Sequence, residues 1–393
     1  MELLAPAGDL EKLKIAVIYG ADAVFVGGHD FSLRSRASNF TFEELKEGAE
    51  FCHKHNAKLY VTTNIIPHNN DLIGLVDYLQ ELEKCNIDAI IASSFAIVEA
   101  AKKYTNLDVH ISTQQSLTNS EAVQFYKDYG LSRVVLAREL SISQIKKIKD
   151  NVDIELEVFI HGGMCSSYSG KCMLSNNMTT RDANRGGCAH SCRWNYRLYE
   201  DDKEVTQNYF FAMSSKDLSA VRQLPKLINA KVDSFKIEGR MKSLHYIATV
   251  VSVYRKLIDE YKNTKTIKDY EKYENEIKKC ENRLTSIGWL EGKLTANEQL
   301  YNMRSEQPTQ EFVGIVKGYD EDKKKYIVEV RNHFKPNSKL EILSPSKDTI
   351  QFKIKTILDE NLEELDAARH PLQLVYIDSK IELNEYDFLR LVK

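Results

Sequence analysis

Short apolar runs alternate with longer amphipathic stretches between residues 3 and 237. The apolar runs are typical of strands buried on both faces, as in a parallel sheet covered by helices. The predicted strands are 3–5, 23–26, 59–62, 89–92, 109–112, 134–137, 156–160 and 234–237. Apolar residues recur at helical spacing in the intervening segments 9–19, 41–55, 72–85, 95–104, 120–129 and 141–149. Repeated strand–helix units predict a parallel sheet, either open or closed into a barrel.

The number of units favours the closed barrel. The eighth run, 234–237, is followed by a long stretch in which Leu244, Ile247 and Val251 recur at helical spacing. Eight strand–helix units fit a (β/α)8 barrel of the TIM type. The first predicted strand is not followed by the Gly-x-Gly-x-x-Gly turn of a dinucleotide-binding sheet. We therefore predict a TIM-type barrel over residues 1–263, with a Cys-rich insertion, residues 163–200, after the seventh strand.

The pattern changes twice after the barrel. Residues 264–308 are rich in Lys and Glu and mostly helical in pattern, which predicts a solvated helical linker. From residue 309 onwards, closely spaced short β-type runs predict a small antiparallel β-barrel domain, residues 309–393. These runs are 312–316, 325–330, 339–343, 350–357 and 372–377. Domains of this kind bind nucleic acid in some proteins and only cover another domain in others.

Composition narrows the class of protein. The chain has 393 residues, 42% hydrophobic and 28% charged, as in ordinary globular proteins. Its net charge of −3 means that any nucleic-acid surface must be a local patch. We expect no membrane span and no secretory signal, because no apolar run is long enough. The odd count of seven cysteines argues against a disulfide framework, so we expect a cytoplasmic protein with reduced thiols.

Four of the seven cysteines lie close together in the predicted insertion: Cys165, Cys172, Cys188 and Cys192. Their spacing is C-x6-C-x15-C-x3-C, among Gly, Ser and Asn residues. Crowded thiolates need a cation between them, so the pattern favours a [4Fe–4S] cluster over a structural zinc ion or unrelated thiols. Zinc ribbons usually have shorter gaps than the first one here. The other three cysteines lie in helical patterns and are expected to be ordinary packed residues.

Polar residues that follow the predicted strands are candidates for an active site, because TIM barrels place it at the carboxyl ends of their strands. The Cys-rich insertion starts at this rim, which predicts a metal centre beside the catalytic site. His161 follows the seventh strand, either as a proton donor or as a histidine hydrogen-bonded to backbone. Basic residues outnumber acidic ones in the insertion, which suits a carboxylate substrate or an RNA phosphate. The alternative, that these cations only offset thiolate charge, stays open.

Several motifs resemble one known family. The stretch EVFIHGGMCSSYSGKCMLS, residues 157–175, closely resembles the signature of the collagenase-like peptidase family of unknown catalytic type. It departs only at Gly163, where the family usually has Ser or Ala. The resemblance extends over nearly the whole chain, through LLAPAGD at 3–9, ISTQQSLTN at 111–119, NRGGCAHSCRW at 184–194, SSKDL at 214–218 and KIEGRMKS at 236–243. The phrases VEVRNHF at 328–334 and EILSP at 341–345 resemble the subgroup of tRNA hydroxylation proteins.

This resemblance implies an activity, partners and site residues. It implies hydroxylation of the tRNA wobble uridine to 5-hydroxyuridine without O2, with prephenate as the hydroxyl donor. It also implies that the four cysteines bind the [4Fe–4S] cluster. Paired relatives in the family leave a paralogous partner subunit or a homodimer open for this chain. We expect arginines to hold the two carboxylates of prephenate, because guanidinium groups bind carboxylates in a bidentate manner. The candidates are Arg138, Arg181, Arg185 and Arg240 for these carboxylates, and Glu238 and His161 for acid–base chemistry.

Three alternatives to tRNA hydroxylation stay open. The family label suggests a peptidase, although the sequence has no Gly-x-Ser-x-Gly or His-Glu-x-x-His motif to support one. Relatives in the family hydroxylate a ribosomal RNA cytidine or act in pairs in ubiquinone hydroxylation. The substrate could therefore be another RNA or a small molecule, and the chain could be a non-catalytic partner subunit.

Overall fold

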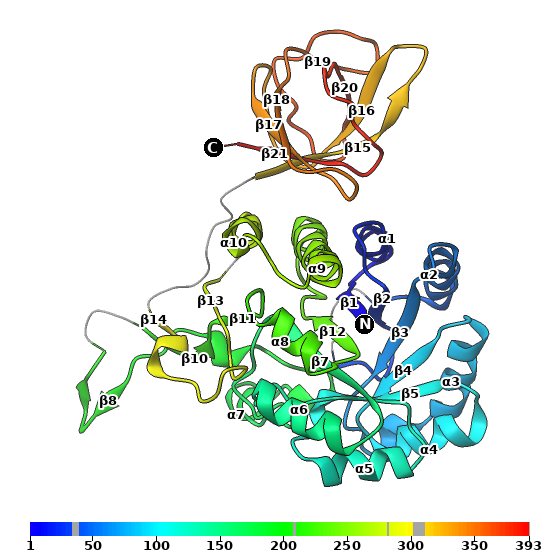
Figure 1. The fold of residues 1–393 in the computed structure, drawn as a ribbon, viewed down its shortest axis with the longest axis vertical. Helices are drawn as coiled ribbons and strands as arrows, with labels where there is room; N and C mark the ends of the chain where they lie inside the picture. Colours follow the sequence, from blue (N-terminus) through cyan, green and yellow to red (C-terminus); the bar gives the residue numbers. More distant parts are fainter. Residues whose placement is uncertain (34–38, 207–209, 281–282, 302–310, 393) are drawn as a thin grey trace.

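The structure is a computed structural model that describes residues 1–393 except 34–38, 207–209, 281–282, 302–310 and 393. Within the described residues, eight parallel strands form a closed barrel, since β12 pairs with both β7 and β1. The strands are β1 Glu2–Pro6, β2 Ala23–Gly27, β3 Lys58–Thr63, β4 Ala89–Ala92, β5 Asp108–Ile111, β6 Arg133–Val135, β7 Glu155–Gly162 and β12 Ser234–Ile237. The predicted TIM-type barrel is confirmed (Figure 1).

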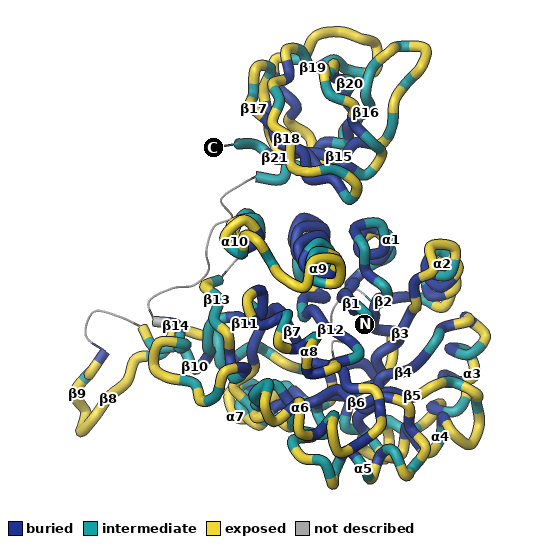
Figure 2. Tube along the Cα trace, viewed as in Figure 1, coloured by how far each residue is buried: buried dark blue, intermediate teal, exposed yellow. Residues whose placement is uncertain are grey.

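Helices cover the outside of the barrel. They are α1 Leu10–Ile18, α2 Phe42–Lys54, α3 Leu75–Lys84, α4 Phe95–Tyr104, α5 Ser120–Asp128, α6 Ile142–Asn151, α8 Leu224–Asn229 and α9 Leu244–Thr264. Side chains of Asp9, Thr41 and Ser141 accept a hydrogen bond from the first turn of α1, α2 and α6, which fixes where these helices begin. Figure 2 shows the buried residues gathered on the strands and on the inner sides of the helices.

The barrel interior combines an apolar layer with a polar one. Leu4, Phe25, Tyr60 and Ile91 form part of a buried apolar cluster of strand residues. The polar layer contains an ion-pair network of β-strand side chains, which are Glu2, Arg133, Glu155, Glu157 and Lys236. Charged groups survive in this interior because each one is paired with another.

The chain between β7 and β12 forms an extension of the barrel. It contains α7 Leu174–Met178, β8 Tyr199–Glu200, β9 Lys203–Glu204, β10 Phe211–Ser215 and β11 Asp217–Ser219. Strand β11 returns antiparallel to β7, so the inserted segment continues past residue 200. The β8–β9 hairpin projects from the body of the molecule (Figure 1).

The segment predicted as a helical linker, residues 264–308, contains one α-helix and two short strands in its described part. Only α10, Tyr270–Lys278, is an α-helix in the described part of residues 265–301. Tyr273 and Ile277 are four residues apart and buried, so one face of α10 packs instead of being solvated. The short strands β13 Thr285–Ser286 and β14 Gln299–Tyr301 pair with β11 and β10, which ties this segment to the Cys-rich extension.

The C-terminal domain is an antiparallel sheet that curls around its own core (Figure 1). Its strands are β15 Glu311–Asp320, β16 Lys325–Val330, β17 Lys339–Leu343, β18 Ile350–Lys353, β19 Ile357–Leu358, β20 Leu374–Ile377 and β21 Phe388–Leu391. In the described residues, the edge strands β18 and β19 are not paired with each other, so the sheet is an open barrel. The sequence prediction missed β21, which lies between β15 and β17.

This domain is docked on helices of the barrel and not on its mouth. The hydroxyl of Tyr19, the residue directly after α1, lies 2.9 Å from the Leu343 carbonyl oxygen and 2.8 Å from that of Tyr386. Phe312 stacks on His245 of α9, with 5.6 Å between the ring centres. Arg390 is fully buried and pairs at 2.6 Å with Glu276 of α10. These contacts join the two domains through one continuous apolar core.

Candidate functional site

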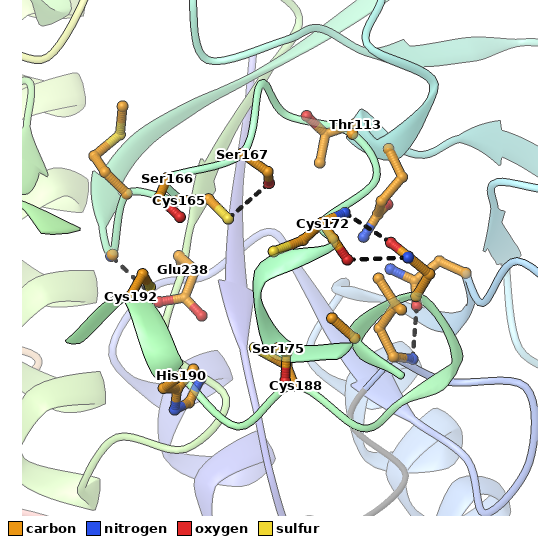
Figure 3. Close-up of a pocket in the computed structure, with 18 of the residues that line it drawn as sticks. Thr113, Cys165, Ser166, Ser167, Cys172, Ser175, Cys188, His190, Cys192 and Glu238 are labelled. Carbon is orange, nitrogen blue, oxygen red and sulfur yellow. Dashed lines mark hydrogen bonds between the residues drawn. The ribbon is translucent and has the colours of Figure 1, made fainter. Parts of the chain in front are cut away.

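A cavity of about 470 Å³ opens at the carboxyl ends of the barrel strands, and a volume of this size suits a small ligand or a single base. Residues of strands β2, β3, β4, β6, β7 and β12 form its floor. The Cys-rich extension forms the wall that carries the cysteines (Figure 3). All of its lining residues lie between positions 25 and 241. The C-terminal domain is therefore not part of the cavity wall that the described residues form.

All four predicted ligand cysteines line this cavity as free thiols (Figure 3). The chain enters the cavity wall through Gly162, whose φ of +105° and close contact with the Glu238 carbonyl leave no room for a Cβ atom. Asn184 then clamps Cys172. Its Oδ1 accepts a hydrogen bond from the Cys172 N–H at 2.9 Å, and its Nδ2 donates to the Cys172 carbonyl at 3.2 Å. A second link, from the Ala189 N–H to Ser175 Oγ at 2.9 Å, holds the segment beside Cys188.

The donor set is compatible with an iron–sulfur cluster. Burial raises the pKa of the Cys192 thiol, Arg193 opposes this shift, and Cys165 and Cys188 raise the pKa further through their negative charge. Cys192 is therefore near enough to Cys165 and to Cys188 for their thiolates to repel it, which a cation between them would relieve. Among the described residues, no three His, Cys, Asp or Glu side chains are close enough to hold a single metal ion. A multi-iron cluster is a larger body than one ion, and all four thiols line the same cavity.

Glu238 lies inside the cavity directly after β12. Its Oε2 accepts a hydrogen bond from the Gly163 N–H at 3.3 Å, and Figure 3 shows its carboxylate on the same side of the cavity as Cys165 and Cys192. Glu238, the predicted acid–base candidate, therefore lines the same cavity as the thiols and can contact a ligand bound there.

His161 takes a different position from the one predicted for a proton donor. Its side chain is buried, it is not a lining residue of the cavity, and its Nδ1 lies 3.2 Å from the Tyr254 hydroxyl of α9. Burial lowers the pKa of His161 to about 3, so the imidazole is neutral at ordinary pH. This geometry is that of a hydrogen-bonded core histidine and gives His161 no contact with a cavity ligand.

The four predicted arginines fall into two groups. Arg138 and Arg181 line the cavity, and the Arg138 guanidinium stacks 3.7 Å from the centre of the Phe159 ring. Arg181 donates through Nη2 to the Cys188 carbonyl at 3.3 Å. Both can reach an anionic ligand from these positions.

Arg185 and Arg240 are held by the protein itself. Arg185 is outside the cavity lining and makes a bidentate ion pair with Asp71, at 2.7 and 2.6 Å, so its predicted role in carboxylate binding is not supported. Arg240 lines the cavity but is buried, and it donates to Ser32, Thr62 and Asn39. A side chain at Gly27 would collide with the Arg240 guanidinium, so this strand end is shaped around Arg240.

Two cationic residues of the cavity were not among the predicted ligand-binding residues. Lys236 lines its floor although it belongs to β12, and Arg193 lines the wall beside Gly163. The sequence signal for Lys236 is a lysine between Phe235 and Ile237 in a predicted buried strand, which is an unusual place for an unpaired charge. Arg193 is one of the basic residues that outnumber acidic ones in the insertion, and no motif sets it apart from the others.

Comparison with known proteins places these features in a family. A model of peptidase family U32 matches residues 8–300, and a model of the peptidase family U32 C-terminal domain matches residues 308–390. The chain is similar to tRNA hydroxylation protein P1 of Bacillus subtilis, at 51% identity over 97% of this chain and 92% of that protein. It is similar to the 23S rRNA 5-hydroxycytidine C2501 synthase of Escherichia coli, at 38% identity over 66% of this chain and 39% of that protein. It is also similar to a collagenase of Porphyromonas gingivalis, at 37% identity over 67% of this chain and 66% of that protein.

Proposed function

The chain belongs to peptidase family U32, and on that premise we propose that it is an enzyme that hydroxylates a base of tRNA. The observation that carries the proposal is the cavity at the barrel mouth, which four thiols and a set of cations line. Its volume of about 470 Å³ is sufficient for one base turned out of an RNA strand. A relative that is half identical over nearly the full length of both chains is named a tRNA hydroxylation protein.

The finer form of the proposal is conversion of the wobble uridine to 5-hydroxyuridine with prephenate as the hydroxyl donor. Arg138 and Arg181 support it, because both stand in the cavity and a guanidinium suits a carboxylate. Glu238 is the group that would accept or return a proton at the base, because its carboxylate lies within the cavity. Since His161 is buried beside Tyr254, we assign it a supporting role beneath the site.

We propose that Cys165, Cys172, Cys188 and Cys192 hold a [4Fe–4S] cluster. Replacing the hydrogen on a pyrimidine carbon by hydroxyl removes two electrons from the base, and the co-substrate that gives up its hydroxyl has to take up these electrons. An iron–sulfur cluster would supply a centre for electron transfer between the two. Asn184 keeps the Cys172 segment in place for this ligand set. Arg193 stands beside the thiols, where its positive charge offsets theirs.

The rim of the cavity offers contacts for RNA. Tyr168 and Trp194 are exposed, at 61% and 44%, on the segments that carry the cysteines. Exposed aromatic rings next to cations are suited to stacking on unpaired bases. The C-terminal domain sits on α1 and α9, so we propose that it contacts the body of the tRNA and leaves the reacting base to the barrel.

One experiment tests the proposal as a whole. Nucleosides from the tRNA of cells with and without the gene are compared by mass spectrometry, and the purified protein is incubated with casein. We expect 5-hydroxyuridine and its derivatives to disappear without the gene, and casein to stay intact. Unchanged nucleosides together with cleaved casein would instead establish a peptidase.

A further inference from the structure

The floor of the cavity carries a buried lysine that the proposed function has not yet used. Lys236 is 4% exposed and reaches the cavity from β12. Its ammonium lies 4.4 Å from the centre of the Phe25 ring and 5.5 Å from that of Phe159. A desolvated cation between two rings is attracted to their faces, but rings do not neutralise its charge.

A second cation shares one of these rings. The Arg138 guanidinium lies 3.7 Å from the centre of Phe159, so Arg138 and Lys236 both contact this side chain. The two cations oppose each other, and Arg138 is among the groups that lower the pKa of Lys236, after burial and Arg133. An anion placed between them would relieve this repulsion.

The carboxylate that pairs with Lys236 is shared with another cation. Glu157 is fully buried, with Oε1 at 2.5 Å from Lys236 Nζ and Oε2 at 3.5 Å from Arg133 Nη1. Arg133 pairs in addition with Glu2 and Glu155. A lysine ammonium has three N–H donors, and Glu157 takes one of them. The others can serve a ligand in the cavity, which Lys236 lines.

The charged residues that line the cavity also favour an anionic ligand. Among the described lining residues there are five cations and one carboxylate, which are Arg138, Arg181, Arg193, Lys236 and Arg240 against Glu238. Arg181 and Arg193 belong to the Cys-rich wall and can offset thiolate charge there. Lys236 and Arg138 come from the barrel instead, and their surroundings on the floor include Phe25, Ile91, Val135 and Phe159.

We propose that Lys236 and Arg138 form a carboxylate-binding subsite on the cavity floor, which holds the small ring-bearing organic acid that serves as co-substrate. Its ring packs against Phe25 and Phe159, and its carboxylate lies between the two cations. The tRNA base enters above it, on the side of the cysteines. The identity of this acid as prephenate rests on the proposed function, whereas the subsite itself rests on the floor geometry. An RNA phosphate does not suit this place, because Lys236 is only 4% exposed on the floor of the cavity.

The test is designed to separate ligand binding from the structural role of the ion pair. The Glu157→Gln/Lys236→Met double variant removes both charges of the pair, so it leaves no unpaired buried lysine behind. The matched control is Lys149→Met/Asp233→Asn, which removes an ion pair of 2.6 Å whose residues do not line the cavity. Calorimetric titration of each full-length protein, purified without oxygen, with prephenate and separately with phenylpyruvate gives the dissociation constants. Thermal unfolding confirms that each variant is folded.

We expect the Glu157→Gln/Lys236→Met protein to bind prephenate at least tenfold more weakly than the unmodified protein and the control. We also expect the single variant Glu157→Gln to bind it more tightly, because the competing carboxylate is gone while Lys236 remains. Equal dissociation constants in the double variant and the control would overturn the subsite, as would the absence of prephenate binding to the unmodified protein. If binding depends on Lys236 but tRNA nucleosides do not change without the gene, the subsite stands and the proposed function fails.

Discussion

At the scale of single residues, the four cysteines and Glu238 were predictable, whereas the roles of His161 and Arg185 were not. The cysteines are close in sequence and share one loop, so their meeting at the cavity follows from local pattern and barrel topology. Arg185 and His161 are occupied by Asp71 and Tyr254, which are 114 and 93 residues away in the chain. Partners at such separations depend on the packing of the whole barrel, which no local pattern contains.

Asn184 is the residue whose loss should most directly disturb the ligand loop without touching a thiol. In the Asn184→Ala variant, the Cys172 N–H and carbonyl lose their partner, at a cost of about 1 kcal/mol for each hydrogen bond. We expect a clear fall in iron bound per chain after anaerobic purification, measured by metal analysis. Asn184→Asp keeps the acceptor and loses the donor, so its iron content should lie between those of the unmodified protein and of Asn184→Ala. Full iron content in Asn184→Ala would contradict the role of the clamp.

His161 makes a prediction about pH. Burial lowers its pKa from the ordinary 6.5 to about 3 in the folded chain, so between these limits the unfolded state binds more protons. The stabilising contribution of neutral His161 is therefore complete above about pH 6.5 and is lost as pH falls, by up to about 1.4 kcal/mol per pH unit. The urea midpoint should fall between pH 6.5 and pH 5 more steeply for the unmodified protein than for His161→Gln. Parallel midpoints in the two proteins would show that His161 titrates normally, as an exposed proton donor would.

At the scale of elements, the barrel strands were found close to their predicted places because each is a short apolar run between amphipathic helices. The solvated state of the linker and the presence of β21 were not predicted correctly. The linker was predicted to be solvated because its composition is rich in Lys and Glu. Tyr273 and Ile277, however, share one face of α10, and this face is buried. Strand β21 was missed because Arg390 interrupts its apolar pattern, and only the carboxylates of Glu276 and Glu341 explain why this arginine is buried.

Arg390 therefore predicts a large effect on stability. Removing one partner of a buried ionic cluster leaves the others uncompensated, at a cost of about 3 kcal/mol. We expect Arg390→Met to lower the free energy of unfolding by this order, measured with urea. Arg369→Met provides the control, because its ion pair with Asp366 is exposed and its loss should change stability little. Similar losses in the two variants would show that the Arg390 cluster does not hold α10 and the C-terminal domain together.

At the scale of the whole molecule, the two domains have different relations to the site. The barrel and its Cys-rich extension form the whole described lining of the cavity, and the C-terminal domain is anchored behind it on α1, α9 and α10. No helix in the described ranges is long and apolar enough to cross a membrane. Because the C-terminal domain does not line the cavity, we expect the barrel to carry out the chemistry and the C-terminal domain to bind tRNA. A change in the C-terminal sheet should then weaken tRNA binding and leave prephenate binding intact. Titrations of a folded variant with each ligand measure this separation, and equal losses for both ligands would contradict it.

The central claim is that hydroxylation of tRNA takes place at the cysteine-lined cavity. The most direct test restores the gene to cells that lack it, either unmodified, with Cys188→Ser, or with the Lys149→Met/Asp233→Asn control pair, and measures 5-hydroxyuridine derivatives in their tRNA. The account predicts that the unmodified gene and the control pair restore these nucleosides and that Cys188→Ser does not, at equal protein levels. Full restoration by Cys188→Ser would contradict it.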